Sequence, residues 1–202
     1  MSTPSPTAPV VMVIRHAEKP PSSPPPHGVN TNGDHDDESL TVVGWQRAGA
    51  LAVLFDPFAG ALQARQLVKP AYLYAADPGK KDKKSQRPFE TISPLAARLG
   101  LNIDTGFDKN DWQAMIAAAL QQTVPVLICW QHQLIPSIAG GVPVVQGACI
   151  PPQWPETRFD LVWVFTLQSG SAQYTFTQVP QNLLAGDENT TIPCPPPPAP
   201  PS

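Results

Sequence analysis

Short apolar runs alternate along the chain with longer segments of mixed polarity. Three runs are almost wholly apolar, as is typical of strands buried on both faces of a sheet: 9–14, 71–75 and 124–130. Segments predicted to be helical follow these runs, at 40–55, 85–99, 111–122 and, as a helical turn, 133–139. A short strand is expected at 101–104, and the closing strands 159–167 and 172–179 alternate in polarity as an antiparallel edge does.

Repeated strand–helix units predict an α/β fold. We expect a three-layer sandwich, in which a mostly parallel central sheet carries helices on both faces. In such sheets, ligands bind outside the carboxyl ends of the strands. The polar residues that directly follow the apolar runs are therefore the first candidates for a functional site.

The 27 prolines of the chain are concentrated in a few segments. We expect a disordered N-terminal segment at 1–9, one domain at 10–186 and a proline-rich C-terminal tail at 187–202. Polyproline segments are extended and can dock in SH3-like or WW-like grooves. A solvated tail without a partner is the simpler expectation.

Composition narrows the function classes. A net charge of −3 and a pI near 5.7 argue against nucleic-acid binding. No apolar stretch approaches the roughly 20 residues of a membrane span, and the N-terminus lacks an export signal, so we expect a cytoplasmic protein. Of the three cysteines, Cys129 is expected to be buried. Cys149 and Cys194 could pair, but free thiols are expected in the cytoplasm. The oligomeric state is not predicted.

Two arginines and two histidines fall at three successive strand ends. Arg15 and His16 follow the first apolar run, Arg87 opens the helix after the second, and His132 follows the third. Each of these residues taken alone would usually be structural. Together they predict a phosphoryl-transfer site, because a neutral imidazole can attack phosphorus and arginine binds phosphate in a bidentate manner.

Four motifs in the same order resemble the histidine phosphatase superfamily, which has the phosphoglycerate mutase-like fold. Residues 14–18 (I-R-H-A-E) resemble its R-H-G-E signature, and 40–48 resemble its L-T-x-x-G segment. Residues 85–91 resemble its S…R-x-x-Q-T segment, and His132 stands at the place of the second histidine. The resemblance covers roughly residues 10–180 and departs from the commonest pattern at Ala17, Glu90 and Gln133.

The resemblance implies a role for each matched residue. His16 would be the phosphorylated nucleophile, and Arg15, Arg87 and His132 would bind the phosphoryl group. Glu18 and Glu90 would support the pocket. No cofactor and no metal are implied.

The proton donor has no full motif match. Asp108, in the loop after the strand at 101–104, is our choice, since many members of the family protonate the leaving oxygen with a carboxylate. Asp111 is expected to cap its helix instead. The other carboxyl groups left open as candidates are Asp36, Asp37, Glu38 and Asp104. A site without a dedicated acid would favour good leaving groups such as phosphohistidine.

These observations predict a metal-independent phosphatase, a hydrolase that acts on a phosphomonoester through a phosphohistidine intermediate on His16. The alternatives are a phosphohistidine protein phosphatase and a non-catalytic module that binds phosphate or phosphoprotein. The partner would be a small phosphorylated substrate or a phosphoprotein.

Two charged loops are further candidates for binding sites. His27, Asp34, His35, Asp36 and Asp37 match no standard cation-binding loop, so we expect a solvated acidic loop. A second loop is basic, and we expect it to steer anionic substrates towards the site; its lysines are Lys80, Lys81, Lys83 and Lys84.

Overall fold

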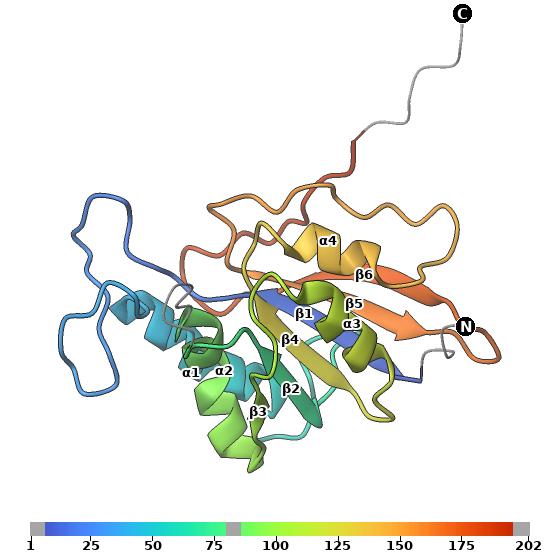
Figure 1. The fold of residues 1–202 in the computed structure, drawn as a ribbon, viewed down its shortest axis with the longest axis horizontal. Helices are drawn as coiled ribbons and strands as arrows, with labels where there is room; N and C mark the ends of the chain where they lie inside the picture. The colour runs from blue at the N-terminus through green and yellow to red at the C-terminus, as the bar shows by residue number, and fades with distance from the viewer. Residues whose placement is uncertain (1–6, 80–85, 196–202) are drawn as a thin grey trace, which may run out of the picture.

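The chain folds around a six-stranded sheet, seen in a computed structural model that describes residues 7–79 and 86–195 (Figure 1). The strands are β1 (Val10–Arg15), β2 (Tyr72–Ala75), β3 (Ile103–Asp104), β4 (Val126–Trp130), β5 (Leu161–Leu167) and β6 (Tyr174–Pro180). The helices are α1 (Val42–Phe55), α2 (Gln86–Leu99), α3 (Trp112–Leu120) and α4 (Ile135–Gly140). Each element coincides with a predicted segment.

The sheet has the strand order β3-β2-β4-β1-β5-β6. The pairs β3–β2, β2–β4 and β4–β1 are parallel, while β5 runs antiparallel to both β1 and β6. In the β1–β4 register, Arg15 lies opposite Trp130. The chain therefore leaves these two neighbouring strands at the same level, just before His16 and His132.

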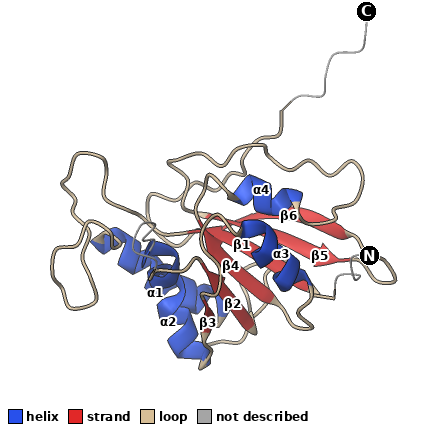
Figure 2. Cartoon of the chain, viewed as in Figure 1, coloured by secondary structure: helices blue, strands red, loops and turns tan. Residues whose placement is uncertain are grey.

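Helices cover both faces of the sheet (Figure 2). On one face, Met12 and Ile14 of β1 belong to a buried cluster with side chains of α1 and α2. On the other face, Val11 and Val13 pack in a cluster with side chains of α3 and α4. Because β1 is buried along its whole length, its apolar run has no polar face. The predicted α/β class with a mostly parallel sheet between two helical layers is confirmed.

Local sequence signals explain where the helices begin and end. Thr41 is the N-cap of α1, and its Oγ1 accepts a hydrogen bond from the N–H of Gly44 over 3.2 Å. Gly100 follows α2 with φ of 67°, a conformation that glycine adopts without strain. Asp111 precedes α3, but its side chain makes no capping hydrogen bond. Its Oδ2 accepts from the N–H of Asp108 instead, over 3.2 Å.

Parts of both expected end segments are packed against the domain. Ala8 is fully buried, and the N–H of Thr7 donates to the carbonyl of Leu120 over 2.7 Å. Near the other end, Asp187 is buried in an ion pair and Ile192 is only 5% exposed. Residues 7–9 and 187–194 are thus held by tertiary contacts, which differs from the expected disordered segment and solvated tail. Residues 1–6 and 196–202 lie outside the described ranges.

The cysteine expectation needs a correction. Cys149 and Cys194 form a disulfide, rather than remaining free thiols. The bond joins the loop after α4 to the C-terminal segment. Cys129 in β4 is free and buried, as expected. Within the described ranges, no helix has the length and apolar character needed to cross a bilayer.

Candidate active site

The parallel pair β1–β4 brings two of the expected site residues to one edge of the sheet. The N–H of His16 donates to the carbonyl of Trp130 over 3.0 Å, which extends the β1–β4 ladder by one residue. His132 follows Trp130 by two positions. Both imidazoles are buried, with 5% of His16 and 7% of His132 exposed.

The ring of His16 is held in one tautomer. Its Nδ1 lies 2.7 Å from the carbonyl oxygen of Ala17. A carbonyl oxygen only accepts, so Nδ1 carries the proton and Nε2 of the neutral ring has a free lone pair. Burial lowers the pKa of His16 to about 3, and the positive charge of Arg15 contributes in the same direction. The ring is therefore neutral at physiological pH.

Arg15 is fully buried next to His16. Its Nη1 donates to the carbonyl of Arg158 over 3.1 Å and also to the carbonyl of Glu156. The guanidinium carbon lies 3.7 Å from the centre of the Phe159 ring. Its Nε and Nη2 are buried and find no acceptor among the described residues. Two buried donors of a positive group thus stay open for an anion.

His132 shares the surroundings of Arg15. Burial, followed by the charge of Arg15, lowers the pKa of His132 to about 4, and the carboxylate of Glu156 opposes this shift. Its Nδ1 is buried without a hydrogen-bond partner in the described part of the chain. Glu156 forms an ion pair with Lys19 over 3.2 Å. Glu156, Lys19 and Phe159 lie in loops without any sequence motif, and sequence reasoning missed them.

Arg87 lies in the first turn of α2. Its Nη2 donates to the carbonyl of Asp37 over 2.6 Å. Its charge also lowers the pKa of His16, after burial and Arg15. Thr91, one turn later in α2, links Arg87 to Ala17, the residue after His16. Its Oγ1 accepts from the N–H of Ala17 over 2.8 Å and donates to the carbonyl of Arg87 over 2.7 Å. The structure therefore brings Arg87 into the electrostatic surroundings of His16.

Glu90 is a buried anchor for the loop that precedes α1. Its carboxylate accepts from Oγ of Ser39 over 2.7 Å and from the N–H of Leu40 over 2.9 Å. Burial raises its pKa. Glu90 thus acts indirectly: it fixes the chain close to Asp37, whose carbonyl accepts from Arg87.

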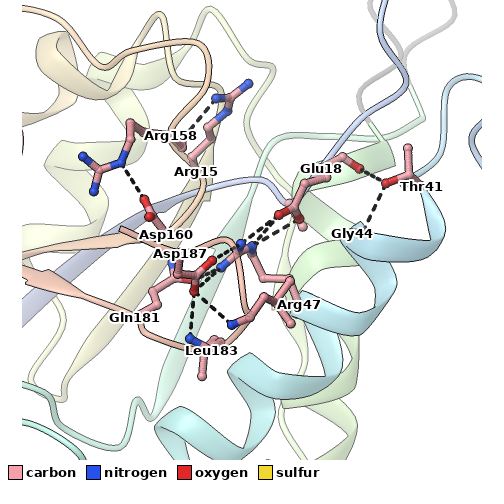
Figure 3. A network of polar contacts seen from close by, with 12 residues as sticks. Arg15, Glu18, Thr41, Gly44, Arg47, Arg158, Asp160, Gln181, Leu183 and Asp187 are labelled. Atoms are coloured by element: carbon pink, nitrogen blue, oxygen red, sulfur yellow. Dashed lines mark hydrogen bonds and ion pairs between the residues drawn. The ribbon is translucent and has the colours of Figure 1, made fainter. Parts of the chain in front are cut away.

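Glu18 contacts Arg47 (Figure 3). Arg47 of α1 is 3% exposed, and its guanidinium bonds the carboxylates of both Glu18 and Asp187, at 2.8 and 2.6 Å. A close approach permits this contact: a Cβ on Gly44 would lie 2.5 Å from the carbonyl oxygen of Glu18. The carboxylate of Glu18 therefore ties the chain after His16 to α1 and to the C-terminal segment.

Asp108 lies in the loop between β3 and α3 and is 5% exposed. Its Oδ1 accepts from the N–H of Asn110 over 3.0 Å. The adjacent carbonyl of Lys109 accepts from Nε1 of Trp130 over 3.1 Å. Because the main chain of Trp130 also bonds His16, Asp108 lies at the same edge of the sheet as the two histidines. Ser85 and the four lysines of the basic loop fall outside the described residues.

A cavity of about 160 Å³ adjoins this region. Phe159, Glu18, Arg158 and Asp187 contribute to its wall. The Phe159 ring centre lies 6.3 Å from that of His16. Phe159 therefore contacts the buried guanidinium of Arg15 and also lines this cavity.

No protein-family model and no curated protein matches the chain. Among solved structures, a mycobacterial hydrolase aligns with a TM-score of 0.42 and 12% identity, over 84% of this chain and 88% of that chain. An ecdysone phosphate phosphatase from Bombix mori, in complex with tungstate, aligns with a TM-score of 0.48 and 14% identity, over 96% of both chains. Such distant likenesses do not show a family, and membership of the histidine phosphatase superfamily stays a prediction from the motifs.

Proposed function

We propose that this protein is a metal-independent phosphatase of the histidine phosphatase type, with His16 as its nucleophile. The observation that carries the proposal is the tautomer of His16. The carbonyl of Ala17 accepts a hydrogen bond from Nδ1–H, so Nε2 of the buried, neutral ring has a free lone pair with which to attack phosphorus.

The reaction would take place in two steps. Nε2 of His16 attacks the phosphorus of a phosphomonoester, and the bond between phosphorus and the ester oxygen breaks. The leaving oxygen takes a proton and departs as an alcohol. Water then attacks the phosphohistidine and gives one proton to the carboxylate that protonated the leaving oxygen; the P–N bond breaks, and inorganic phosphate leaves with Nε2 regenerated. The positive charge of Arg15 and Arg87 would stabilise the oxygens of the transferred group in both steps.

The open donors support binding of a dianion. Nε and Nη2 of Arg15 and the unpartnered Nδ1 of His132 are buried, and an unsatisfied buried polar atom is costly. Phosphate oxygens would accept hydrogen bonds from all of them, if the neutral ring of His132 carries its hydrogen on Nδ1. This set of donors meets the requirement for fixed hydrogen bonds around a transferring phosphoryl group.

Asp108 remains our proposed proton donor for the leaving oxygen. Its carboxyl is 5% exposed and lies at the edge of the sheet that carries the histidines, where a general acid for the leaving oxygen is required. Asp108→Asn should then slow hydrolysis of an alkyl phosphate far more than hydrolysis of p-nitrophenyl phosphate, whose leaving group needs no proton. An equal loss on both substrates would argue against this role.

The compartment is a separate question. The sequence led us to expect the cytoplasm, whereas the Cys149–Cys194 disulfide supports a compartment in which disulfides persist. We propose an oxidising compartment in place of the cytoplasm. Labelling of free thiols before and after reduction tests the bond itself.

Hydrolysis of p-nitrophenyl phosphate in the presence of EDTA tests the proposed activity. Wild type should turn over, His16→Ala should be inactive, and Arg65→Met, which changes an exposed residue without a role in the site, should match wild type. Activity that EDTA abolishes would contradict the metal-independent mechanism. Binding of vanadate without turnover would leave the non-catalytic phosphate-binding module as the better account.

A further inference from the structure

Two histidines and one aspartate gather in the loop between β1 and α1. Oδ1 of Asp37 lies 3.4 Å from Nδ1 of His27 and 3.0 Å from Nε2 of His35. The ring centres of the two histidines are 4.4 Å apart. One nitrogen from each ring and one carboxylate oxygen all lie within 4.8 Å of one another, and all three side chains are exposed.

The backbone of the loop explains this grouping. Val29 pairs with His35 and Gly28 pairs with Thr41 in antiparallel bridges, which folds the loop back on itself. The N–H of Asp36 donates to the carbonyl of Gly28 over 3.0 Å. A Cβ at Gly28 would lie 2.1 Å from the carbonyl oxygen of Asp36, so only glycine allows the two stretches of chain to approach this closely.

Trp45 of α1 fixes the folded loop to the domain. Its Nε1 donates to the carbonyl of Val29 over 2.7 Å. The N–H of Gly28 also donates to Oδ1 of Asp37, over 3.3 Å. Main-chain contacts thus fix the fold of the loop that carries His27, His35 and Asp37, and the N–H of Gly28 holds the carboxylate of Asp37.

We propose that His27, His35 and Asp37 form a binding site for a divalent zinc ion, with water in the remaining coordination position. Zinc takes imidazole nitrogen and carboxylate oxygen at about 2.0–2.2 Å in a tetrahedron, which places neighbouring ligand atoms about 3.3–3.6 Å apart. The 3.4 Å from Asp37 Oδ1 to Nδ1 of His27 matches this spacing, and the 3.0 Å to Nε2 of His35 is a few tenths of an ångström shorter. Two imidazoles with one carboxylate suit zinc and its neighbours in the transition series better than calcium or magnesium.

The expectation of a simple solvated loop rested on sequence spacing alone. That spacing, with His27 and His35 eight residues apart, matches no standard motif, because the ligands meet through the fold of the loop. The site also touches the proposed phosphate pocket through one residue. The carbonyl of Asp37 accepts from Arg87, so a bound ion would fix the residue that holds this guanidinium. The binding proposal itself does not rest on the proposed phosphatase function.

Calorimetric titration of the full chain with zinc chloride, after treatment with EDTA and its removal, tests the site. Wild type should bind one ion per chain, and His27→Ala/His35→Ala should lose this binding. Asp37→Asn should weaken it at least about tenfold, in line with the effect of perturbing a metal's ligand shell. Asp34→Asn and Glu38→Gln change exposed carboxylates of the same loop, serve as matched controls and should bind as wild type does.

A second measurement needs no variant. In the wild-type protein, zinc should shift the ring proton NMR signals of His27 and His35 and leave those of His16 and His132 in place. Excess calcium or magnesium should not reverse the shifts. The proposal is overturned if wild type binds no zinc, if the double variant binds as tightly as wild type, or if the signals of His16 and His132 are the ones that move.

Discussion

The guanidinium of Arg15 stacks on the ring of Phe159, with 3.7 Å between its carbon atom and the ring centre. A desolvated cation–π contact contributes about 1 to 2 kcal/mol. Phe159→Leu keeps an apolar side chain and removes the π face, so Arg15 would be held less firmly against the phosphoryl group. We predict that kcat/KM for p-nitrophenyl phosphate falls about 5- to 30-fold, as those energies imply.

The chain offers a matched control for this change. Arg98 lies over the ring of Phe58 at 4.1 Å, and Phe58 is 85% exposed. Phe58→Leu removes the same kind of contact at a position apart from the strand ends, so its kcat/KM should equal that of wild type. Equal kinetic losses in the two variants would show that the stacking on Phe159 has no special role in the site.

The pKa of His16 predicts how stability depends on pH. Burial lowers this pKa from 6.5 to about 3, so between these values the unfolded chain binds a proton that the folded chain does not. Stability contributed by the neutral ring is present above pH 6.5 and is lost as pH falls towards 3. His16→Gln cannot titrate, and its free energy of unfolding should fall less steeply over this window.

Urea unfolding of wild type and His16→Gln at several pH values measures the difference. Nitrogen NMR of the wild-type ring adds a direct check, because it should report a neutral imidazole protonated at Nδ1 at pH 5.5. Parallel stability curves for the two proteins, or a His16 ring that gains its proton near pH 6.5, would contradict the buried neutral state on which nucleophilic attack depends.

Arg47 is predicted to be a main support of the C-terminal segment. It bonds the carboxylates of Glu18 and Asp187, whose side chains are 19% and 3% exposed. Arg47→Met leaves both carboxylates without this partner, and loss of one member of a buried ion pair costs about 3–5 kcal/mol. Urea unfolding should show a loss of that size. Arg65→Met, at an exposed arginine, should change stability little, and similar small effects in both variants would refute the role of Arg47.

The disulfide is predicted to leave one free thiol. Of the three cysteines, Cys129 is free and Cys149 is bonded to Cys194. A thiol reagent added to the protein after unfolding without reductant should therefore label one cysteine per chain, and after reduction it should label three. The bond closes a loop with a sequence separation of 45, for which chain entropy gives about 4 kcal/mol of stabilisation. Three labelled cysteines before reduction would contradict the pairing.

The strands and the site edge could be predicted from sequence because local patterns determine them. The apolar run before Arg15 and the one before Gln131 form neighbouring parallel strands, so the polar residues that follow them meet. Thr41 marked the start of α1 through an ordinary capping contact. The strands and the helix start depend on residues close together in the chain, and the shared edge follows from the general rule for parallel sheets.

The parts that sequence reasoning missed depend on long-range contacts. Proline-rich composition suggested a solvated tail, but Asp187 meets Arg47 from 140 residues away. Glu156 and Phe159 reach Arg15 through an irregular loop, in which the indole of Trp154 donates to the carbonyl of Arg158. His27 and His35 meet only because the loop folds back at Gly28. No periodicity or motif in the sequence predicts these long-range contacts.

Detection of a phosphoryl group on His16 is the most direct test of the central claim. Wild type mixed rapidly with p-nitrophenyl phosphate and quenched in alkali, where phosphohistidine survives, should yield a peptide that carries one phosphoryl group on His16 at Nε2. His16→Ala should yield none. In wild type, the phosphoryl group on His16 should disappear once the substrate has been used up. Turnover without any phosphorylated intermediate, or a phosphoryl group on another residue, would contradict the account.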